Sequence, residues 1–179
     1  MSKITILVGS ERKGGNTAML VEAFADGAKQ NNNVKIISVS DYKVNACKGC
    51  ESCSVDSKNQ CCQQDDMQKI YSEMLTTDVL VIASPVYFYG ISAQLKAIVD
   101  RMHTPMRNRF GIKKLALLLV AGADLSTVFD PIILQYKMIL NYFKLDDAGM
   151  ILVNDVRDFG KISDNPALKK AFNLGRSLI

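Results

Sequence analysis

Five short strand-like runs recur along the chain, and helix-like segments separate them. A continuous apolar run is typical of a strand buried on both faces, and such strands occur in parallel sheets covered by helices. The expected strands span residues 3–8, 33–39, 78–84, 114–121 and 150–153. The alternation therefore predicts the α/β class, with a doubly wound, five-stranded parallel sheet.

Apolar residues at helical spacing mark the segments between the expected strands. In residues 65–75, apolar side chains recur at i, i+3, i+4 and i+7 from Met67, which predicts an amphipathic helix. Pro131 and Pro166 stand near the starts of two further helices, where the missing proline N–H costs least. The remaining helices are expected over residues 17–30, 91–102, 131–142 and 166–178.

Five parallel strands of this kind fit the order 2-1-3-4-5. In that order the winding reverses between strands 1 and 3, and a ligand is expected at the carboxyl ends of those strands. The chain has 179 residues, which suffices for one domain with a sizeable core. Residues 1–179 are thus expected to form a single domain, with an irregular cysteine-rich loop over residues 40–64 inserted after strand 2.

Charge and hydropathy argue against several classes of function. The chain carries 22 basic and 18 acidic residues, a net charge of +4, which is too small and too dispersed for a nucleic-acid surface. No apolar run approaches the ~20 residues of a membrane span, and no basic leader precedes the first strand. These features predict a cytoplasmic protein that binds small anionic molecules, with no nucleic acid or membrane partner.

The loop after the first strand reads GSERKGGNT over residues 9–17 and opens a helix. Free N–H groups and the dipole at a helix N-terminus attract an anion. Gly15 lets the backbone approach closely, and Arg12 offers a planar fork for a phosphate. Short hydrogen-bonding side chains come from Ser10, Asn16 and Thr17.

The glycine spacing of this loop narrows the choice of phosphate. Gly9 and Gly14 have the G-x-x-x-x-G spacing of a P-loop, but Gly15 stands where that motif needs lysine. The G-x-G-x-x-G fingerprint of dinucleotide sites is absent as well. A terminal monophosphate fits what remains, and a glycine-rich surface turn is the alternative.

The loop after the third strand reads SPVYFYG over residues 84–90. Three successive aromatic residues, preceded by a stiffening proline and ended by Gly90, offer a surface against which a flat heteroaromatic ring could lie. An aromatic-rich core turn is the alternative for this loop alone. Taken with the first loop, it defines a site with a phosphate end and a ring end, which describes flavin mononucleotide (FMN).

All five cysteines fall between Cys47 and Cys62. The first three have the spacing C-x-x-C-x-x-C, which can wrap one small iron–sulfur cluster. Structural zinc sites more often use two well-separated pairs, so this motif is too compact for zinc. A loop of free thiols, partly linked by disulfides, is the alternative.

The motifs GSxRxGGNT and SPVYFxG, with the QLK and DR sequences that follow at residues 94–96 and 100–101, resemble those of NAD(P)H-dependent FMN reductases with a flavodoxin-like fold. The resemblance is closest to the iron–sulfur flavoproteins. It implies that the first loop holds the FMN phosphate, that the second packs on the isoalloxazine, and that a third loop after strand 4 closes the site. The cofactor-binding residues expected on this basis are Ser10, Arg12, Gly15, Asn16, Thr17, Pro85, Val86, Tyr87, Phe88, Gly90, Ala121 and Gly122.

The same resemblance implies a 4Fe-4S cluster in the cysteine loop. In the family, the fourth cysteine stands shortly before an Asp-Asp-Met sequence, which here begins at Asp65. The implied ligands are Cys47, Cys50, Cys53 and Cys61. Cys62 is adjacent to Cys61 and competes with it as the fourth ligand.

The expected function is an FMN-dependent oxidoreductase. It takes hydride from NAD(P)H and passes electrons to a small acceptor or to the iron–sulfur centre. The first alternative is a non-enzymatic carrier that shuttles electrons between proteins such as ferredoxin, and the second is a quinone or azo-compound reductase without a cluster. Because the cofactor supplies the chemistry, no catalytic side chain is expected. The resemblance also implies a homodimer or homotetramer.

Overall fold

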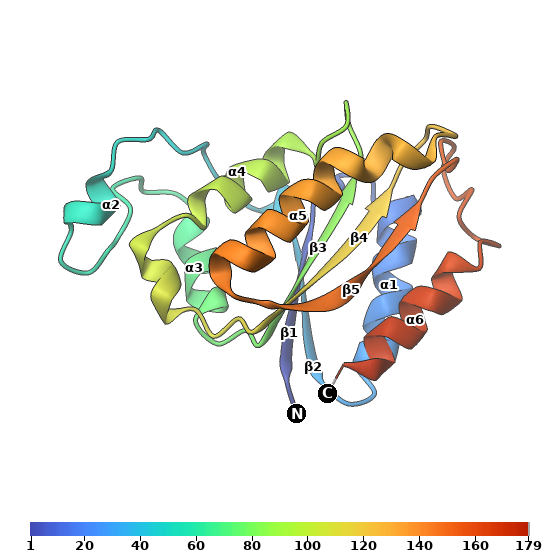
Figure 1. Ribbon diagram of the computed structural model, residues 1–179, viewed down its shortest axis with the longest axis horizontal. Helices are drawn as coiled ribbons and strands as arrows, with labels where there is room; N and C mark the ends of the chain where they lie inside the picture. Colours follow the sequence, from blue (N-terminus) through green and yellow to red (C-terminus); the bar gives the residue numbers. More distant parts are fainter. Residues whose placement is uncertain (179) are drawn as a thin grey trace.

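A central parallel sheet, covered by helices on both faces, forms the protein (Figure 1). The structure is a computed structural model that describes residues 1–178. The sheet order β2-β1-β3-β4-β5 confirms the predicted winding. The strands are β1 (Lys3–Val8), β2 (Asn33–Ser38), β3 (Val79–Pro85), β4 (Lys114–Val120) and β5 (Asp146–Val153).

The helices fall into two layers, one on each face of the sheet (Figure 1). One layer consists of α1 (Asn16–Ala28) and α6 (Ala167–Ser177). The other consists of α3 (Met67–Met74), α4 (Ala93–Arg101) and α5 (Asp130–Phe143). A short helix, α2 (Ser52–Val55), lies in the cysteine loop, and three 3₁₀ turns complete the chain: η1 (Val39–Asp41), η2 (Pro105–Arg109) and η3 (Ser126–Phe129).

Successive residues of β4 point to opposite faces of the sheet, as the pleat of a strand requires, and each face has its own hydrophobic core. Leu117 belongs to the core under α3, α4 and α5, whereas its neighbour Leu118 belongs to the core under α1 and α6. Both side chains are at most 2% exposed. This burial on both faces explains why the strand reads as a continuous apolar run in the sequence.

The α1 and α6 helices pack against each other through glycine. A Cβ atom added at Gly27 would lie 2.0 Å from the carbonyl oxygen of Phe172, and one at Gly175 would lie 2.1 Å from that of Phe24. Neither helix could carry a side chain at these positions without moving apart. The two glycines therefore allow backbone-to-backbone contact between α1 and α6.

The opposite face contains a cavity of about 960 Å³ between α4, η2 and α5, above β3 and β4. Its walls are largely apolar and include Leu117 and Val99. At its rim, His103 Nε2 lies 2.8 Å from the Tyr142 hydroxyl, and the Arg107 guanidinium lies over the Tyr142 ring at 5.3 Å. The helices on this face thus leave open space above β3 and β4.

The β5 strand begins at Asp146, four residues before the start expected from its apolar run. Asp146 pairs with Lys114 and Asp147 pairs with Leu115, and the register shifts only after this second pair, between Leu115 and Leu117. The Tyr136 hydroxyl lies 2.6 Å from Asp147 Oδ1 and 2.6 Å from the Leu115 carbonyl oxygen, so the two acceptors share its single hydrogen. Burial, followed by this contact with a carboxylate, raises the pKa of Tyr136.

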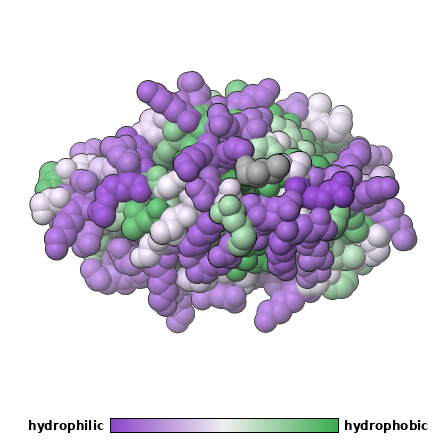
Figure 2. All heavy atoms as spheres, turned by 90° about the horizontal axis from the view of Figure 1, so that it is seen from below, coloured by the Kyte–Doolittle hydropathy of each residue, from purple (hydrophilic) through white to green (hydrophobic). Residues whose placement is uncertain are grey.

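Hydrophilic side chains cover most of the face that carries the chain termini (Figure 2). This face corresponds to the amino-terminal ends of the strands (Figure 1). Within residues 1–178, no helix is both long and apolar enough to cross a membrane.

Candidate functional site

A cleft of about 260 Å³ lies at the carboxyl ends of β1, β3 and β4, where a doubly wound sheet is expected to bind its ligand. The loops after these three strands and the segment after β5 form its walls. The lining residues are Ser10, Arg12, Gly15, Asn16, Thr17, Pro85, Val86, Tyr87, Val120, Gly122, Val156 and Arg157.

The loop after β1 folds back on itself before α1 begins. The Gly15 N–H donates to the Arg12 carbonyl oxygen at 3.2 Å, and the Arg12 N–H donates to the Ser10 hydroxyl at 3.3 Å. Gly15 is the N-cap of α1, and no side chain caps this end of the helix. The first N–H groups of α1 have no partner within the helix, so this end of the cleft favours an anion.

Asn16 connects this loop to the segment after β5. Its side-chain amide donates to the carbonyl oxygens of Val156 and Asp158, both at 2.8 Å. Its Oδ1 accepts the Ile162 N–H at 3.3 Å. Asn16 lines the cleft, but its amide group is already engaged in fixing the loop, a role that the sequence did not reveal.

The loop after β3 forms a narrow hairpin. Tyr87 and Gly90 exchange backbone hydrogen bonds of 2.9 and 3.0 Å, and the two residues between them have positive φ angles, 47° at Phe88 and 64° at Tyr89. A turn with two left-handed residues usually takes asparagine and glycine. The aromatic tip is therefore strained, and Phe88 is 98% exposed.

Nine of the expected cofactor residues line the cleft. The exceptions are Phe88 and Gly90, which lie in the hairpin tip, and Ala121, which is buried behind the loop after β4. Their expected contacts with a cofactor stay predictions. Arg157 was missed because it lies in an irregular segment with no local motif, although the end of β5 adjoins that of β4. Its presence adds a second arginine to the cleft.

These groups fit a mononucleotide. Arg12, Arg157 and the uncapped end of α1 suit a phosphate, while Pro85, Val86 and Tyr87 present a flat, mainly apolar wall. The cleft is smaller than the ~300–1,000 Å³ typical of enclosing ligand sites. FMN bound here would therefore be partly enclosed and partly open to a second reactant.

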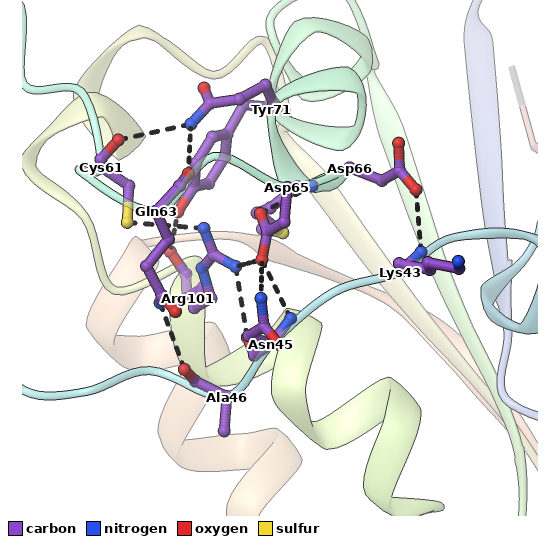
Figure 3. A network of polar contacts seen from close by, with 11 residues as sticks. Lys43, Asn45, Ala46, Cys61, Gln63, Asp65, Asp66, Tyr71 and Arg101 are labelled. Carbon is purple, nitrogen blue, oxygen red and sulfur yellow. Dashed lines mark hydrogen bonds and ion pairs between the residues drawn. The ribbon is translucent and has the colours of Figure 1, made fainter.

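A polar network ties the base of the cysteine loop to α4 (Figure 3). The buried Arg101 guanidinium pairs with Asp65 through Nη1 at 2.5 Å and donates to the Asn45 carbonyl oxygen at 3.2 Å. Asp65 also accepts the backbone N–H groups of Asn45 at 2.9 Å and Met67 at 3.2 Å. These contacts hold the two ends of the loop side by side.

The network shifts the titration of its members. Burial acts to raise the pKa of Asp65, but the hydrogen bonds from Arg101, Asn45 and Met67 outweigh it and hold the pKa below its usual value. The Tyr71 hydroxyl donates to the Arg101 carbonyl oxygen at 2.8 Å. Burial raises the pKa of Tyr71 to about 12.

The cysteines beyond this base have different surroundings. Cys61 Sγ accepts from Arg101 Nη2 at 3.4 Å, whereas the neighbouring Cys62 is exposed and lies 3.8 Å from Cys50, sulfur to sulfur. Ser52 Oγ lies 2.9 Å from Cys50 Sγ and 3.3 Å from Cys62 Sγ. Hydrogen bonds with Ser52, followed by that with Cys62, lower the pKa of Cys50 to about 7.

The arrangement of the cysteine loop does not match a preformed metal site. Within residues 1–178, no group of three or more cysteine, histidine or acidic side chains is gathered so that it could hold a metal ion. One of the four predicted ligands, Cys61, accepts a hydrogen bond from Arg101 instead. As folded here, the donor set does not fit a cluster, and binding one would require the loop to rearrange.

Known proteins resemble this chain in sequence and in fold. The family model described as NADPH-dependent FMN reductase matches residues 2–130. An iron–sulfur flavoprotein from Methanosarcina thermophila is 35% identical over 167 residues, covering 92% of this chain and 84% of that protein. Iron–sulfur flavoprotein MJ1083 from Methanocaldococcus jannaschii is 36% identical over 155 residues, covering 86% of this chain and 76% of that protein.

A solved structure shares the same fold. It is the NAD(P)H:quinone oxidoreductase from Methanothermobacter marburgensis, which superposes with a TM-score of 0.74 over 98% of this chain and 96% of that one. The two sequences are 16% identical.

Proposed function

This chain belongs to the NADPH-dependent FMN reductase family, and we propose that it binds FMN in the cleft between the β1 and β3 loops and reduces a small acceptor with NAD(P)H. Membership of the family makes it an FMN-dependent oxidoreductase. When bound, FMN accepts the electrons of a reduced nicotinamide and passes them on. The observation that carries the proposal is that the uncapped start of α1, two arginines and an apolar wall meet in one cleft.

The chain's own residues have separable tasks in this proposal. Arg12 and Arg157 hold the phosphate, and Asn16 keeps the loop in shape through its contacts with the segment after β5. Tyr87 and its neighbours support the ring, and the open side of the cleft admits the nicotinamide and then a quinone-like acceptor.

The phosphate assignment is tested by comparing FMN with riboflavin, which lacks the phosphate. Arg12→Ala should weaken FMN binding about tenfold or more, because charge-assisted hydrogen bonds are worth roughly 1.5–3 kcal/mol. Riboflavin binding should hardly change. Lys13→Ala is the matched control, since Lys13 is exposed in the same loop and does not line the cleft. Equal losses for both ligands in Arg12→Ala would place the phosphate elsewhere.

The turnover itself is tested with the FMN-loaded protein. Steady-state oxidation of NADH and of NADPH, each with a quinone or an azo dye as acceptor, identifies the donor and the class of acceptor. Failure to oxidise either nicotinamide, together with rapid exchange with a ferredoxin-like protein, would favour the electron-carrier alternative. The names of the two iron–sulfur flavoproteins support keeping that alternative.

We also propose that Cys47, Cys50, Cys53 and Cys61 bind a 4Fe-4S cluster after the loop rearranges. The proposal is supported by the cysteine spacing and by the names of the relatives. Anaerobic purification with matched iron and flavin analysis tests it, and about four irons per chain are expected. Flavin without iron, even after reconstitution with iron and sulfide, would leave a plain FMN reductase.

Self-association is part of the proposed functional state. Leu134, Met138 and Tyr142 recur at four-residue intervals on α5 and are 62%, 65% and 49% exposed. Apolar side chains grouped in this way favour burial against another copy of the chain. Light scattering should give a homodimer or homotetramer, and Met138→Glu should shift it toward the monomer. We expect this assembly in the cytoplasm, which cell fractionation tests.

A further inference from the structure

Cys62 has no role in the proposed ligand set, yet the structure gives it a specific neighbour. Its sulfur lies 3.8 Å from that of Cys50, and both residues are exposed. A disulfide is about 2.05 Å long. Closure therefore requires the two sulfurs to approach by roughly 1.8 Å.

The backbone around this pair is shaped by two turns. Gly49 and Glu51, on either side of Cys50, both have left-handed φ angles, 62° and 57°. That conformation is unfavourable for Glu51 and persists where the surroundings determine it. Farther along, the Asp56 carboxylate accepts the N–H groups of Lys58 and Gln60, both at 2.9 Å. The second turn returns the chain toward Cys50.

The adjacent cysteine, Cys61, differs from Cys62 in its burial and in its hydrogen-bond partner. Cys61 is partly buried, and its sulfur accepts a hydrogen bond from Arg101, which itself is 3% exposed. Because Asp65 holds Arg101 in place, Cys61 is tied to the base of the loop. Cys61 is thus held at the base of the loop, whereas Cys62 is exposed and contacts Ser52 and Cys50.

We propose that Cys50 and Cys62 are a redox-active dithiol pair that closes to a disulfide when the loop carries no metal. The oxidant is a low-molecular-weight disulfide. One protein thiolate attacks it, forming a mixed disulfide and releasing one small thiol. The second protein thiolate then attacks the protein sulfur of the mixed disulfide, closing the bridge and releasing the second small thiol. Two protein thiols lose two protons and two electrons, and the small disulfide gains both.

The bridge would also act on the proposed cluster, and this part of the inference rests on the proposed function. Cys50 is one of the four predicted ligands, so a Cys50–Cys62 disulfide removes a thiolate that the cluster needs. The loop would then have two exclusive states, an oxidised bridge and a reduced form open to iron. The pairing itself does not depend on the cluster, so it can stand even if no iron binds.

The pairing is tested on the full chain with FMN bound, prepared reduced and with chelator to remove metal. Treatment with oxidised glutathione should yield a protein lighter by two hydrogen atoms, with no retained glutathione. Trypsin leaves Cys50 and Cys53 on one peptide and Cys61 and Cys62 on another, so the expected product is a crosslink between these two peptides. Loss of the crosslink in Cys50→Ser but not in Cys53→Ser assigns the first sulfur, and two variants of the second peptide assign the other.

Cys62→Ser should form no crosslink and should instead retain glutathione on Cys50. Cys61→Ser is the matched control and should still close the bridge. The proposal is overturned if wild type retains glutathione without crosslinking, or if the crosslink survives Cys62→Ser and is lost in Cys61→Ser. Prior incubation with iron and sulfide should block closure if a cluster forms, and an absence of bound iron would count against the cluster alone.

Discussion

The two faces of the sheet are built in opposite ways. Under α1 and α6 the helices meet backbone to backbone at Gly27 and Gly175, and the core is filled. Under α4 and α5 a cavity of about 960 Å³ remains, and the exposed apolar side chains of α5 lie beside it. The difference teaches that close packing on one face positions the start of α1 and the proposed phosphate loop, whereas the other face leaves surface and space for interactions.

The polar contacts follow the same division. On the filled side, α1 begins at the proposed phosphate loop, and close helix packing holds it there. On the open side, the base of the cysteine loop is held by one buried ion pair, Arg101 with Asp65. Packing therefore stabilises one functional segment and charge stabilises the other, which makes them separately testable.

The largest effect is expected from Gly27→Leu. Its Cβ alone would lie 2.0 Å from a carbonyl oxygen, so α1 and α6 would have to separate, at a cost above about 4 kcal/mol. Urea denaturation should show a nearly unfolded protein with little FMN bound. Gly90→Ala is the control, because its Cβ meets only the Tyr87 carbonyl oxygen at 3.7 Å, and its stability should be unchanged. A stable Gly27→Leu variant would refute the tight contact.

A matched pair on β4 compares the two cores directly. Leu118→Ala, on the filled face, should lose about 4 kcal/mol, whereas Leu117→Ala, beside the existing cavity, should lose about 2–3 kcal/mol. The reason is that Leu117 has fewer neighbours to lose on its open side. Chemical denaturation of both variants measures the difference. Equal losses would show that the cavity is filled in solution, by a partner copy or by movement of α5.

Acid should weaken the ion pair between Asp65 and Arg101, on the face of the sheet that contains the cavity. The pKa of Asp65 is lower in the folded protein than in the unfolded chain, so its stabilisation is present above the unfolded pKa of about 3.9. It is lost as pH falls through the lower, folded value. The melting temperature of wild type should therefore fall more between pH 5 and pH 2.5 than that of Asp65→Asn. That variant should already be less stable at neutral pH, because it leaves Arg101 buried without its counter-ion. Parallel pH profiles would show that the pair contributes nothing.

The smallest effect is expected from adding one methylene to each helix layer. Val99 lines the cavity, so Val99→Leu should change the free energy of unfolding by less than about 0.5 kcal/mol. Val21→Leu, 2% exposed on α1, should cost about 1–3 kcal/mol because that core is full. Comparable costs for the two substitutions would mean that the faces are packed alike.

Local patterns in the sequence predicted what depends on local periodicity. The strand order is confirmed, and so is the start of α5 with Pro131 in its first turn. The early start of β5 was missed because Asp146 and Asp147 are polar, and their pairing with β4 depends on the sheet edge. That residues 1–179 form a single domain remains a prediction.

The parts of the site that depend on distant residues could not be predicted. Nothing near Arg101 in the sequence indicates that it meets Asp65 and Cys61, which lie 36 and 40 positions away. Nor does the motif around Asn16 indicate its bonds to the segment after β5. The cavity arises from the spacing of α4 and α5, which no periodicity encodes. Motif residues could be placed at the cleft, but not the contacts that support them.

The contact between α1 and α6 has a consequence for the order in which this protein is made. Gly27 and Gly175 are 148 positions apart (175 − 27), so α1 leaves the ribosome long before its partner exists. Contacts of such long range slow folding, and a growing chain exposes unpaired apolar surface in the meantime. The hydrogen bonds of the Asn16 side chain likewise cannot form until Val156 and Asp158 have been synthesised. The proposed phosphate loop, which precedes α1, can therefore take its final shape only after residues 156–158 have been synthesised.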